Sequence, residues 1–387
     1  MEETDFSFDH TRERRGTGSL KWDLYEDRCL PFWVADMDFD SPQEVIDAVS
    51  ARGAHGVFGY ALPKTSERDA VVNYLRQRHG VNCNASWLVW LAGLVPALSV
   101  ASAVANTKGV KSSLTCTPVY PPFLKCPADG GLETIYVSLA EDASGHYSFD
   151  REALEAAVRP DTGLFILCNP HNPVGRVYTR EELEWLGDFC LRHDLLFCSD
   201  EVHCDLILDE ESTPHISLLH LDPEIRDRSI VLMSASKTYN IAGIGCAFAL
   251  IPDSKLRTAF RRAMGGWVPP VNVFGYTATE AAFCHGEPWR KALLVHLRNQ
   301  HQILADYLSA HHPEVRLTKA EATYLAWTDV RGLGIAEPAA HFQKHGIALS
   351  NGADFGASGY LRWNLGCSSS MLEEGLRRFT DGCQTVH

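Results

Sequence analysis

Short apolar runs alternate with amphipathic segments along most of the chain after Asp40. Runs such as 164–168 and 230–233 are apolar at nearly every position, which is typical of strands buried on both faces of a sheet. Between two such runs, segment 181–192 places leucines on one helical face, and Thr179 ahead of it is a suitable N-cap. The runs that predict strands are 87–91, 114–116, 164–168, 195–198, 230–233 and 246–251.

This alternation predicts an α/β fold with a mostly parallel central sheet flanked by helices. A long helix is expected at 289–308, followed by a smaller α+β domain. The run Pro31-Phe32-Trp33-Val34 is too apolar to remain in solvent, so it should pack on that domain or on a partner subunit. The expected units are an N-terminal segment joining the small domain (1–45), a large domain (46–288) and a small C-terminal domain (289–387), the last with strands at 323–328 and 360–365 and helices at 338–345 and 370–379.

Composition narrows the choice of partners and compartment. The chain has 387 residues and a formal net charge of -14, which argues against nucleic acid and anionic membranes as partners. Its 12 cysteines include no Cys-x-x-Cys pair, which indicates free thiols in a reducing cytoplasm. No metal is expected, because His341 and His345 have no third ligand nearby in the sequence. The start Met1 to Asp5 lacks an apolar core, so no standard secretory signal is expected.

The sequence Ser234-Ala235-Ser236-Lys237 follows the apolar run 230–233 directly. A strand that ends in this way can present hydroxyls to a phosphate and an amine to an aldehyde of the same ligand. Pyridoxal 5'-phosphate (PLP) carries both groups and is normally bound by a lysine. Taken alone, the motif also fits an exposed turn, so the residues at the other strand ends are needed to choose between a PLP site and a turn.

Two earlier strand ends carry features that fit the same ligand. At Gly93-Leu94-Val95 a glycine turn precedes a helix, and free N–H groups with the helix dipole make an anion site there. Gly93 and Pro96 also argue against a membrane span in the uncharged stretch 87–105. Tyr120 lies among prolines that stiffen its loop, and its ring could lie flat on a pyridine. The alternative for the 93–95 turn is an ordinary βα turn that binds no ligand, and the alternative for Tyr120 is a surface turn.

The next two strand ends add polar groups. Asn172 follows the run 164–168 in the loop Asn-Pro-His-Asn-Pro, and its amide could donate to a phenolate oxygen. Asp200 ends the following strand, where a buried carboxylate needs a cation such as a protonated pyridine. His203 lies three residues further on and could reach the ring oxygen. Structural turns remain the alternative for each motif taken separately.

The order of these features resembles the fold-type I PLP enzymes, the aspartate aminotransferase superfamily, over nearly the whole chain. Segments 21–23, 32–39, 55–60 and 362–367 further resemble the cystathionine β-lyase subgroup of the MalY/PatB type. The resemblance implies a homodimer with shared active sites, PLP as cofactor and a small amino-acid substrate. It implies roles for Lys237 (covalent attachment and catalysis), Asp200 (ring nitrogen), Tyr120 (ring stacking), Asn172 and His203 (ring oxygen), Gly93, Leu94, Val95, Ser234 and Ser236 (phosphate), Tyr60 (phosphate of the partner's cofactor), and Arg362, Ala35 and Asn172 (substrate).

Four positions depart from the usual patterns. Many aminotransferases carry an arginine at the position of Gly245, and the lyase subgroup, like this chain, lacks that arginine. Ser368-Ser369 stands where the subgroup usually has Pro-Arg, and Trp363 is bulkier than usual, so the substrate pocket is expected to differ. The implied function is a carbon–sulfur β-lyase acting on L-cystathionine or another S-substituted L-cysteine. An L-amino-acid aminotransferase is the main alternative, and a regulatory binding protein with this fold is a more distant one.

Overall fold

The computed structural model describes residues 6–9 and 12–385. The residues Met1 to Asp5, on which the expectation of no secretory signal rests, lie outside this part of the chain. Within the described residues, every helix is too short or too polar to cross a lipid bilayer.

A seven-stranded sheet forms the larger layer of the molecule, in the order β2-β10-β9-β8-β7-β3-β4. Strands β9, β8, β7, β3 and β4 run parallel, and β10 runs antiparallel to both β9 and β2. The expected mostly parallel sheet is therefore confirmed. Its strands are β2 (Leu88–Leu91), β3 (Ser112–Thr117), β4 (Glu133–Ser138), β7 (Thr162–Cys168), β8 (Leu196–Asp200), β9 (Ser229–Met233) and β10 (Ala247–Leu250).

Both faces of this sheet are covered, because successive side chains of a strand point to opposite sides. In β7, Phe165 packs in the core with helix α7 (Arg180–Arg192), and the next residue, Ile166, packs in the core with α4 (Leu94–Asn106). Thr179 caps α7 as predicted, accepting a hydrogen bond from the backbone N–H of Glu182 at 3.2 Å. The remaining helices before residue 286 are α1 (Leu20–Asp23), α2 (Gln43–Ala54), α3 (Thr65–His79), α5 (Pro122–Asp129), α6 (Arg151–Ala157), α8 (Pro223–Arg226), α9 (Ser254–Met264) and α10 (Val273–His285).

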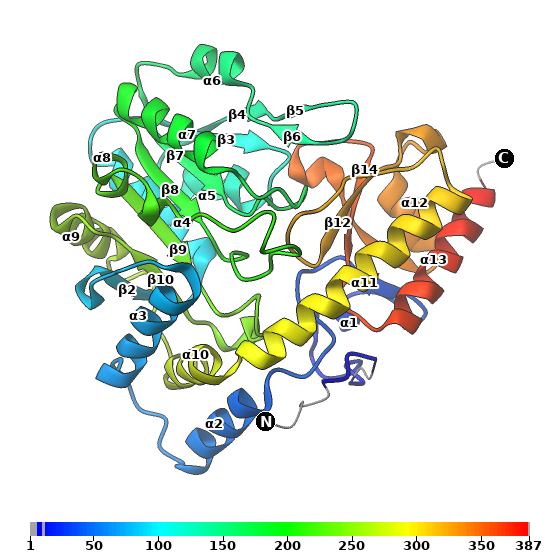
Figure 1. Cartoon of the computed structure of the whole chain (residues 1–387), viewed down its shortest axis with the longest axis horizontal. Coiled ribbons are helices and arrows are strands. Elements are labelled where there is room, and N and C mark those ends of the chain that lie inside the picture. Colours follow the sequence, from blue (N-terminus) through cyan, green and yellow to red (C-terminus); the bar gives the residue numbers. More distant parts are fainter. Residues whose placement is uncertain (1–5, 10–11, 386–387) are drawn as a thin grey trace.

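A second sheet of five strands has the order β1-β13-β14-β12-β11. Helix α11 (Glu287–His311) runs from α10 to this second layer, beside the C-terminal helix α13 (Ser369–Gln384) (Figure 1). The other elements of this layer are α12 (Pro338–Lys344), β1 (Leu30–Phe32), β11 (Arg316–Leu317), β12 (Leu325–Asp329), β13 (Ile347–Asn351) and β14 (Tyr360–Asn364). A short hairpin of β5 (Ala140–Glu141) and β6 (Tyr147–Ser148) forms a separate two-stranded sheet.

Most predicted elements are found close to their expected positions. The strand expected from residue 323 begins two residues later, because Thr323 has a positive φ of 77°. Strands β1, β4, β11 and β13 were not expected from the pattern. β1 overlaps the apolar segment 31–34, which was assigned no element, and the other three are short or carry polar residues. Pairing of β1 with β13 supports the proposed assignment of residues 1–45 to the small domain, and the three domain boundaries stay a proposal.

The segment 33–39 joins the two sheets through its backbone. The side-chain amide of Asn364, in β14, donates to the carbonyls of Val34 and Asp36, both at 2.6 Å. The amide of Asn240, which follows β9, donates to two further carbonyls of the segment at 2.9 and 2.8 Å. Each sheet therefore holds one half of this segment, and the segment passes between them.

Asp38 anchors the same segment from inside the protein. Its carboxylate pairs with the Lys21 ammonium at 2.8 Å, and both side chains are fully buried. Arg14 pairs with it at 2.9 Å, and the indole N–H of Trp22 donates to it at 2.8 Å. A buried carboxylate with this many partners is costly to disrupt, so the path of segment 33–39 is closely specified.

Candidate active site

The predicted chemical residues meet at one edge of the large sheet. Most of them lie at or just after the carboxyl end of β2, β3, β7, β8 or β9, and those strands all point the same way. In an open sheet of this kind, ligands bind outside the carboxyl ends of the strands. A cavity of about 230 Å³ lies there and is lined by Ala35, Gly93, Leu94, Val95, Tyr120, Asn172, Asp200, His203, Ser234, Ser236 and Lys237, among others.

Two predicted site residues lie outside this cavity. Arg362 lines an adjoining cavity of about 540 Å³, which shares Ala35, Tyr120 and Lys237 with the first one. Tyr60 lies in the loop after α2, with its side chain fully exposed. Within a single chain it therefore contacts neither cavity, and its expected role in the site of a partner subunit stays a prediction.

One end of the inner cavity is suited to a phosphate. Helix α4 begins at Leu94, and its first N–H groups have no partner within the helix. Among the described residues, no hydrogen bond is recorded for the Ser236 hydroxyl, which is free to donate to an anion. The Ser234 hydroxyl differs, because it donates to the Cys246 carbonyl at 2.6 Å and accepts from the backbone N–H of Ser236 at 3.0 Å. Ser234 therefore shapes the loop, and Ser236 is the better phosphate donor.

Gly245 lines the same cavity for a backbone reason. It has a positive φ of 69°, and a Cβ built on it would lie 3.1 Å from the Ala92 carbonyl oxygen. A side chain at this position would be strained and crowded. The absence of an arginine here, noted from the sequence, therefore fits the local backbone geometry.

Asp200 is a buried carboxylate without a counter-charge. Its side chain accepts a hydrogen bond from the backbone N–H of Val202 at 3.1 Å, and the structure records no ion pair for it among the described residues. Burial raises its pKa to about 7, while Val202 and the charge of Lys237 act in the opposite direction. A protonated pyridine nitrogen would supply the missing positive charge, so this end of the cavity fits the ring of PLP.

Lys237 points its amine at a backbone carbonyl beside the cavity. Its Nζ donates to the Ala35 carbonyl at 2.7 Å, and the hydroxyl of Tyr324 donates to the same oxygen at 3.0 Å. Burial and, as the next largest cause, the nearby Arg362 charge together lower the pKa of Lys237 to about 8. A lysine with a lowered pKa is more often unprotonated, and the unprotonated amine is the nucleophile. Tyr324 was not predicted, because it lies in an apolar stretch and only the fold brings it to residue 35.

Arg362 is held at the junction of the two cavities. One of its terminal nitrogens donates to the Asn172 side-chain oxygen at 3.1 Å, and the other donates to the Trp33 carbonyl at 2.6 Å and to the Ser350 hydroxyl at 3.2 Å. Its Nε has no partner among the described residues, and burial lowers the pKa of the guanidinium to about 10. A carboxylate ligand would satisfy both the spare donor and the buried charge.

Asn172 and His203 complete the polar lining. Because the Asn172 oxygen is occupied by Arg362, its NH₂ group is left to donate into the cavity. Burial lowers the pKa of His203 to about 3, so its imidazole is neutral at physiological pH, and its Nδ1 has no partner among the described residues. Both side chains can therefore hydrogen-bond to an oxygen on a bound ring.

The expectation that Trp363 and the Ser368-Ser369 pair alter the substrate pocket is wrong. On β14, Arg362 points to the site, and Trp363 points to the opposite face, where it is fully buried against Phe32 and Phe379. Ser368 caps α13, and the Ser369 hydroxyl donates to Gln300. None of the three lines either cavity. Successive side chains of a strand point to opposite faces. The direction of Trp363 therefore depends on which face of β14 forms the core of the small domain.

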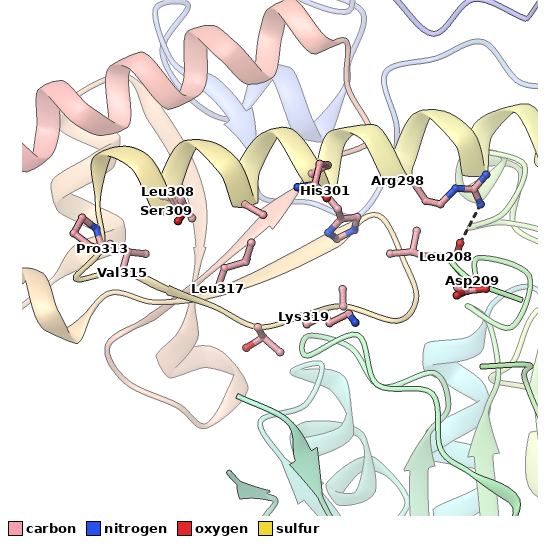
Figure 2. Close-up of a pocket in the computed structure, with 14 residues that line it drawn as sticks. Leu208, Asp209, Arg298, His301, Leu308, Ser309, Pro313, Val315, Leu317 and Lys319 are labelled. Carbon is pink, nitrogen blue, oxygen red and sulfur yellow. Dashed lines mark hydrogen bonds between the residues drawn. The ribbon is translucent and has the colours of Figure 1, made fainter. Parts of the chain in front are cut away.

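A further hollow of about 640 Å³ lies between α11 and segment 313–320 (Figure 2). Its lining includes Arg298, whose guanidinium donates to the Leu208 carbonyl at 3.0 Å, and the apolar side chains Val315 and Leu317. It shares no lining residue with the two cavities at Lys237. The convergence of predicted residues therefore identifies the site, although this hollow is larger.

One group of potential metal ligands occurs in the described residues, and it is already paired internally. The Asp205 carboxylate lies 2.8 Å from His79 Nε2 and 3.7 Å from Arg78 Nε, with Cys204 close by. Burial works against the charge of Asp205, but its partners hold its pKa well below the usual range. This group acts as an internal ion pair behind the site.

The sequence model of the aminotransferase class I and II family matches residues 28–379. The chain belongs to this family. It is 37% identical to cystathionine beta-lyase PatB of Bacillus subtilis (strain 168), across 96% of this chain and 98% of PatB, which confirms the expected subgroup.

Solved structures of this family have the same fold. The crystal structure of OvoB matches with a TM-score of 0.94 and 40% identity, covering 98% of this chain and 100% of OvoB. The PLP-bound C-S lyase from Staphylococcus hominis matches with a TM-score of 0.89 and 28% identity, covering 98% of each chain. The expected α/β fold with a central sheet is thereby confirmed.

We predict that Asp200→Asn weakens PLP retention by about two orders of magnitude or more. Removing one partner of a buried charge pair costs roughly 3–5 kcal/mol, and the variant would leave the pyridine nitrogen without a counter-charge. Equilibrium dialysis followed by cofactor absorbance measures the change. Asp188→Asn, an exposed site on α7, is the control and should retain PLP normally. Equal retention by both variants would contradict the assignment.

We predict that Arg362→Lys raises KM for L-amino-acid substrates by roughly 10- to 100-fold, because a lysine cannot form the two-pronged bond to a carboxylate. Steady-state kinetics measures the effect, and Arg377→Lys on the exposed face of α13 is the control. Thermal unfolding of both variants separates a loss of binding from a loss of folding. A KM unchanged in Arg362→Lys would place the carboxylate elsewhere.

Proposed function

We propose that this protein is a PLP-dependent carbon–sulfur β-lyase. It cleaves L-cystathionine or another S-substituted L-cysteine to a thiol, pyruvate and ammonia. The observation that carries the proposal is the meeting of Lys237, Asp200 and Arg362 at two joined cavities, each side chain without an ionic partner in the described residues. The similarity to PatB and to a PLP-bound C-S lyase supports the same reaction.

The residues of the site have separable tasks in this proposal. When bound, PLP supplies an electron sink for the charge left on Cα after its proton is removed. Asp200 keeps the pyridine nitrogen protonated, and Tyr120 contacts the ring. Arg362 binds the α-carboxylate and so orients the Cα–H bond toward the lysine. The amine of Lys237 accepts the Cα proton, and its place beside the Ala35 carbonyl keeps it at the wall of the cavity.

The fate of the substrate depends on the group at Cβ. A thiolate on Cβ can depart once the Cα proton has been removed, and the outer cavity next to Arg362 offers the space for it. A substrate without such a group would instead be transaminated by the same residues. Lyase activity proceeds without an added keto acid, and aminotransferase activity depends on one.

We predict that the holoenzyme releases pyruvate and thiol from L-cystathionine in the absence of any keto acid. Coupled assays for pyruvate and for free thiol measure both products. Lys237→Ala should lose this activity by several orders of magnitude and lose the visible absorbance of the bound cofactor, because it lacks the amine for both attachment and proton transfer. Strict dependence on a keto acid, with no thiol released from any S-substituted cysteine, would instead establish an aminotransferase.

We also propose that two copies of the chain form a dimer with shared active sites. Val57, Phe58, Tyr60 and Leu62 are all strongly exposed on the loop between α2 and α3. An apolar, aromatic patch of this kind on one loop is typical of an interface. A two-fold dimer would bury the loop twice and bring each Tyr60 to the partner's phosphate site. A cytoplasmic location is proposed as well, because all twelve cysteines are unpaired thiols.

We predict that Lys237→Ala and a strongly impaired Tyr60→Ala variant complement each other. When subunits exchange, a mixed dimer would have one site with both defects and one with neither. Each mixed dimer should therefore recover about half of the activity of a wild-type dimer. Mass spectrometry of tagged subunits confirms exchange, and a mixture of two Lys237→Ala preparations is the control. Proven exchange without recovery would place Tyr60 outside the partner's site.

A further inference from the structure

The outer cavity continues away from Lys237 and Arg362 toward the surface. Tyr25 and Trp33, from the N-terminal segment, line it on one side. The lining also includes residues from α12, β13 and the turn after β13, namely Ala339, Ala340, Gln343, Leu349, Asn351 and Asp354. If Arg362 binds the α-carboxylate, the substituent on sulfur has to extend into this outer part.

The aromatic residues of the outer cavity are suited to a cation. The rings of Tyr25 and Trp33 lie 5.6 Å apart, edge to face, and the indole N–H donates to the Lys21 carbonyl at 3.2 Å. This bond holds the Trp33 ring in place. A positive group near an aromatic face is stabilised by the ring quadrupole, most strongly for tryptophan.

The charges along the cavity are separated. Its two cationic side chains, Lys237 and Arg362, lie at the inner end. Lys237 also lines the cofactor cavity, and Arg362 donates a hydrogen bond to Asn172, which lines that cavity too. Asp354 is the acidic residue of the lining, and it is exposed at the outer end. Among the described residues, the structure records no hydrogen bond or ion pair for its carboxylate. Burial is the largest cause that raises the pKa of Tyr25, and Cys29 and then the nearby Asp354 carboxylate also raise it.

We propose that the outer cavity binds the sulfur substituent of the substrate and selects positively charged substituents over negatively charged ones. This inference rests on the proposed lyase function for the identity of the substituent. A cation would meet Asp354 and the aromatic pair. A carboxylate at the same place would meet Asp354 and only the neutral amides of Gln343 and Asn351, because Arg362 is committed to the α-carboxylate. In a substrate whose sulfur substituent carries both an ammonium and a carboxylate group, the ammonium of that substituent lies toward Asp354.

The test uses amino acids of similar length that carry no leaving group at Cβ and differ in the charge at the end of the side chain. L-Lysine, L-norleucine and L-2-aminoadipate are titrated into the holoenzyme by calorimetry. We expect lysine to bind roughly 10-fold more tightly than 2-aminoadipate, since one partly exposed ion pair is gained and one repulsion is avoided. In Asp354→Asn this ratio should fall to roughly 3-fold or less, while the affinity for norleucine stays the same.

Asp188→Asn is the matched control, because it removes one exposed acid outside the cavity. It should leave the lysine to 2-aminoadipate ratio unchanged. A ratio that favours 2-aminoadipate, or one that Asp354→Asn and Asp188→Asn change equally, would overturn the proposal. So would a failure of all three amino acids to bind to a PLP-loaded enzyme.

The sulfur-containing counterparts separate this inference from the proposed function. S-(2-aminoethyl)-L-cysteine and S-carboxymethyl-L-cysteine are compared by kcat/KM for thiol release, and the former should be preferred by a similar factor. If the calorimetric order holds but neither compound releases thiol, the lyase proposal fails and the charge selection stands. If thiol is released from both with equal kcat/KM and equal binding, the lyase proposal stands and the charge selection fails.

Discussion

The path of segment 33–39 between the two sheets is the constraint on which the site depends. Asn364 of the small sheet and Asn240 of the large one hold its carbonyls, and Asp38 is locked by Lys21 inside the protein. The segment then presents two carbonyls to the site, that of Ala35 to Lys237 and that of Trp33 to Arg362. The two cationic side chains are therefore positioned against the same short stretch of backbone, although they belong to different sheets.

Desolvation then determines the chemistry of the site. Asp200, Lys237 and Arg362 are each shifted in pKa by burial, with the first rising and the other two falling. Such groups are costly to bury and are typical of sites whose ligand supplies the missing charges. A pyridinium complements Asp200 and a substrate carboxylate complements Arg362. The binding of cofactor and substrate would thus complete electrostatic pairs that the protein leaves open.

Two joined cavities divide the recognition of the ligands. The inner one lies at the carboxyl edge of the large sheet and contains the residues proposed to contact the phosphate and the ring of the cofactor. The outer one is bounded by the N-terminal segment and the small sheet, and it shares Ala35, Tyr120 and Lys237 with the inner one. The outer walls come from different elements than the inner walls. Substitutions at residues such as Trp33 and Asp354 can therefore change which substrate is preferred without disturbing the chemistry at Lys237.

The sequence by itself determined the large sheet and most of the inner cavity, because both are encoded by patterns of residues close together in the chain. A buried parallel strand is a continuous apolar run, and the residue after it is placed at the same edge as those after its neighbours, so Asn172, Asp200 and Lys237 could be brought together without coordinates. The same locality explains the correct prediction of Thr179 as the N-cap of α7. Edge strands such as β4 and β11 were missed because their polar positions interrupt the apolar pattern.

Only the tertiary structure decided the contacts between segments distant in the chain. Tyr324 meets the Ala35 carbonyl, Arg362 meets Asn172, and Asp354 lines the same cavity as Trp33 only because the small sheet and the N-terminal segment pack together. The direction of Trp363 away from the site, and the use of the Ser234 proton within its own loop, likewise depend on which face is core and which atoms lie near. No periodicity encodes such pairings, since they arise from packing and not from the spacing of residues along the chain.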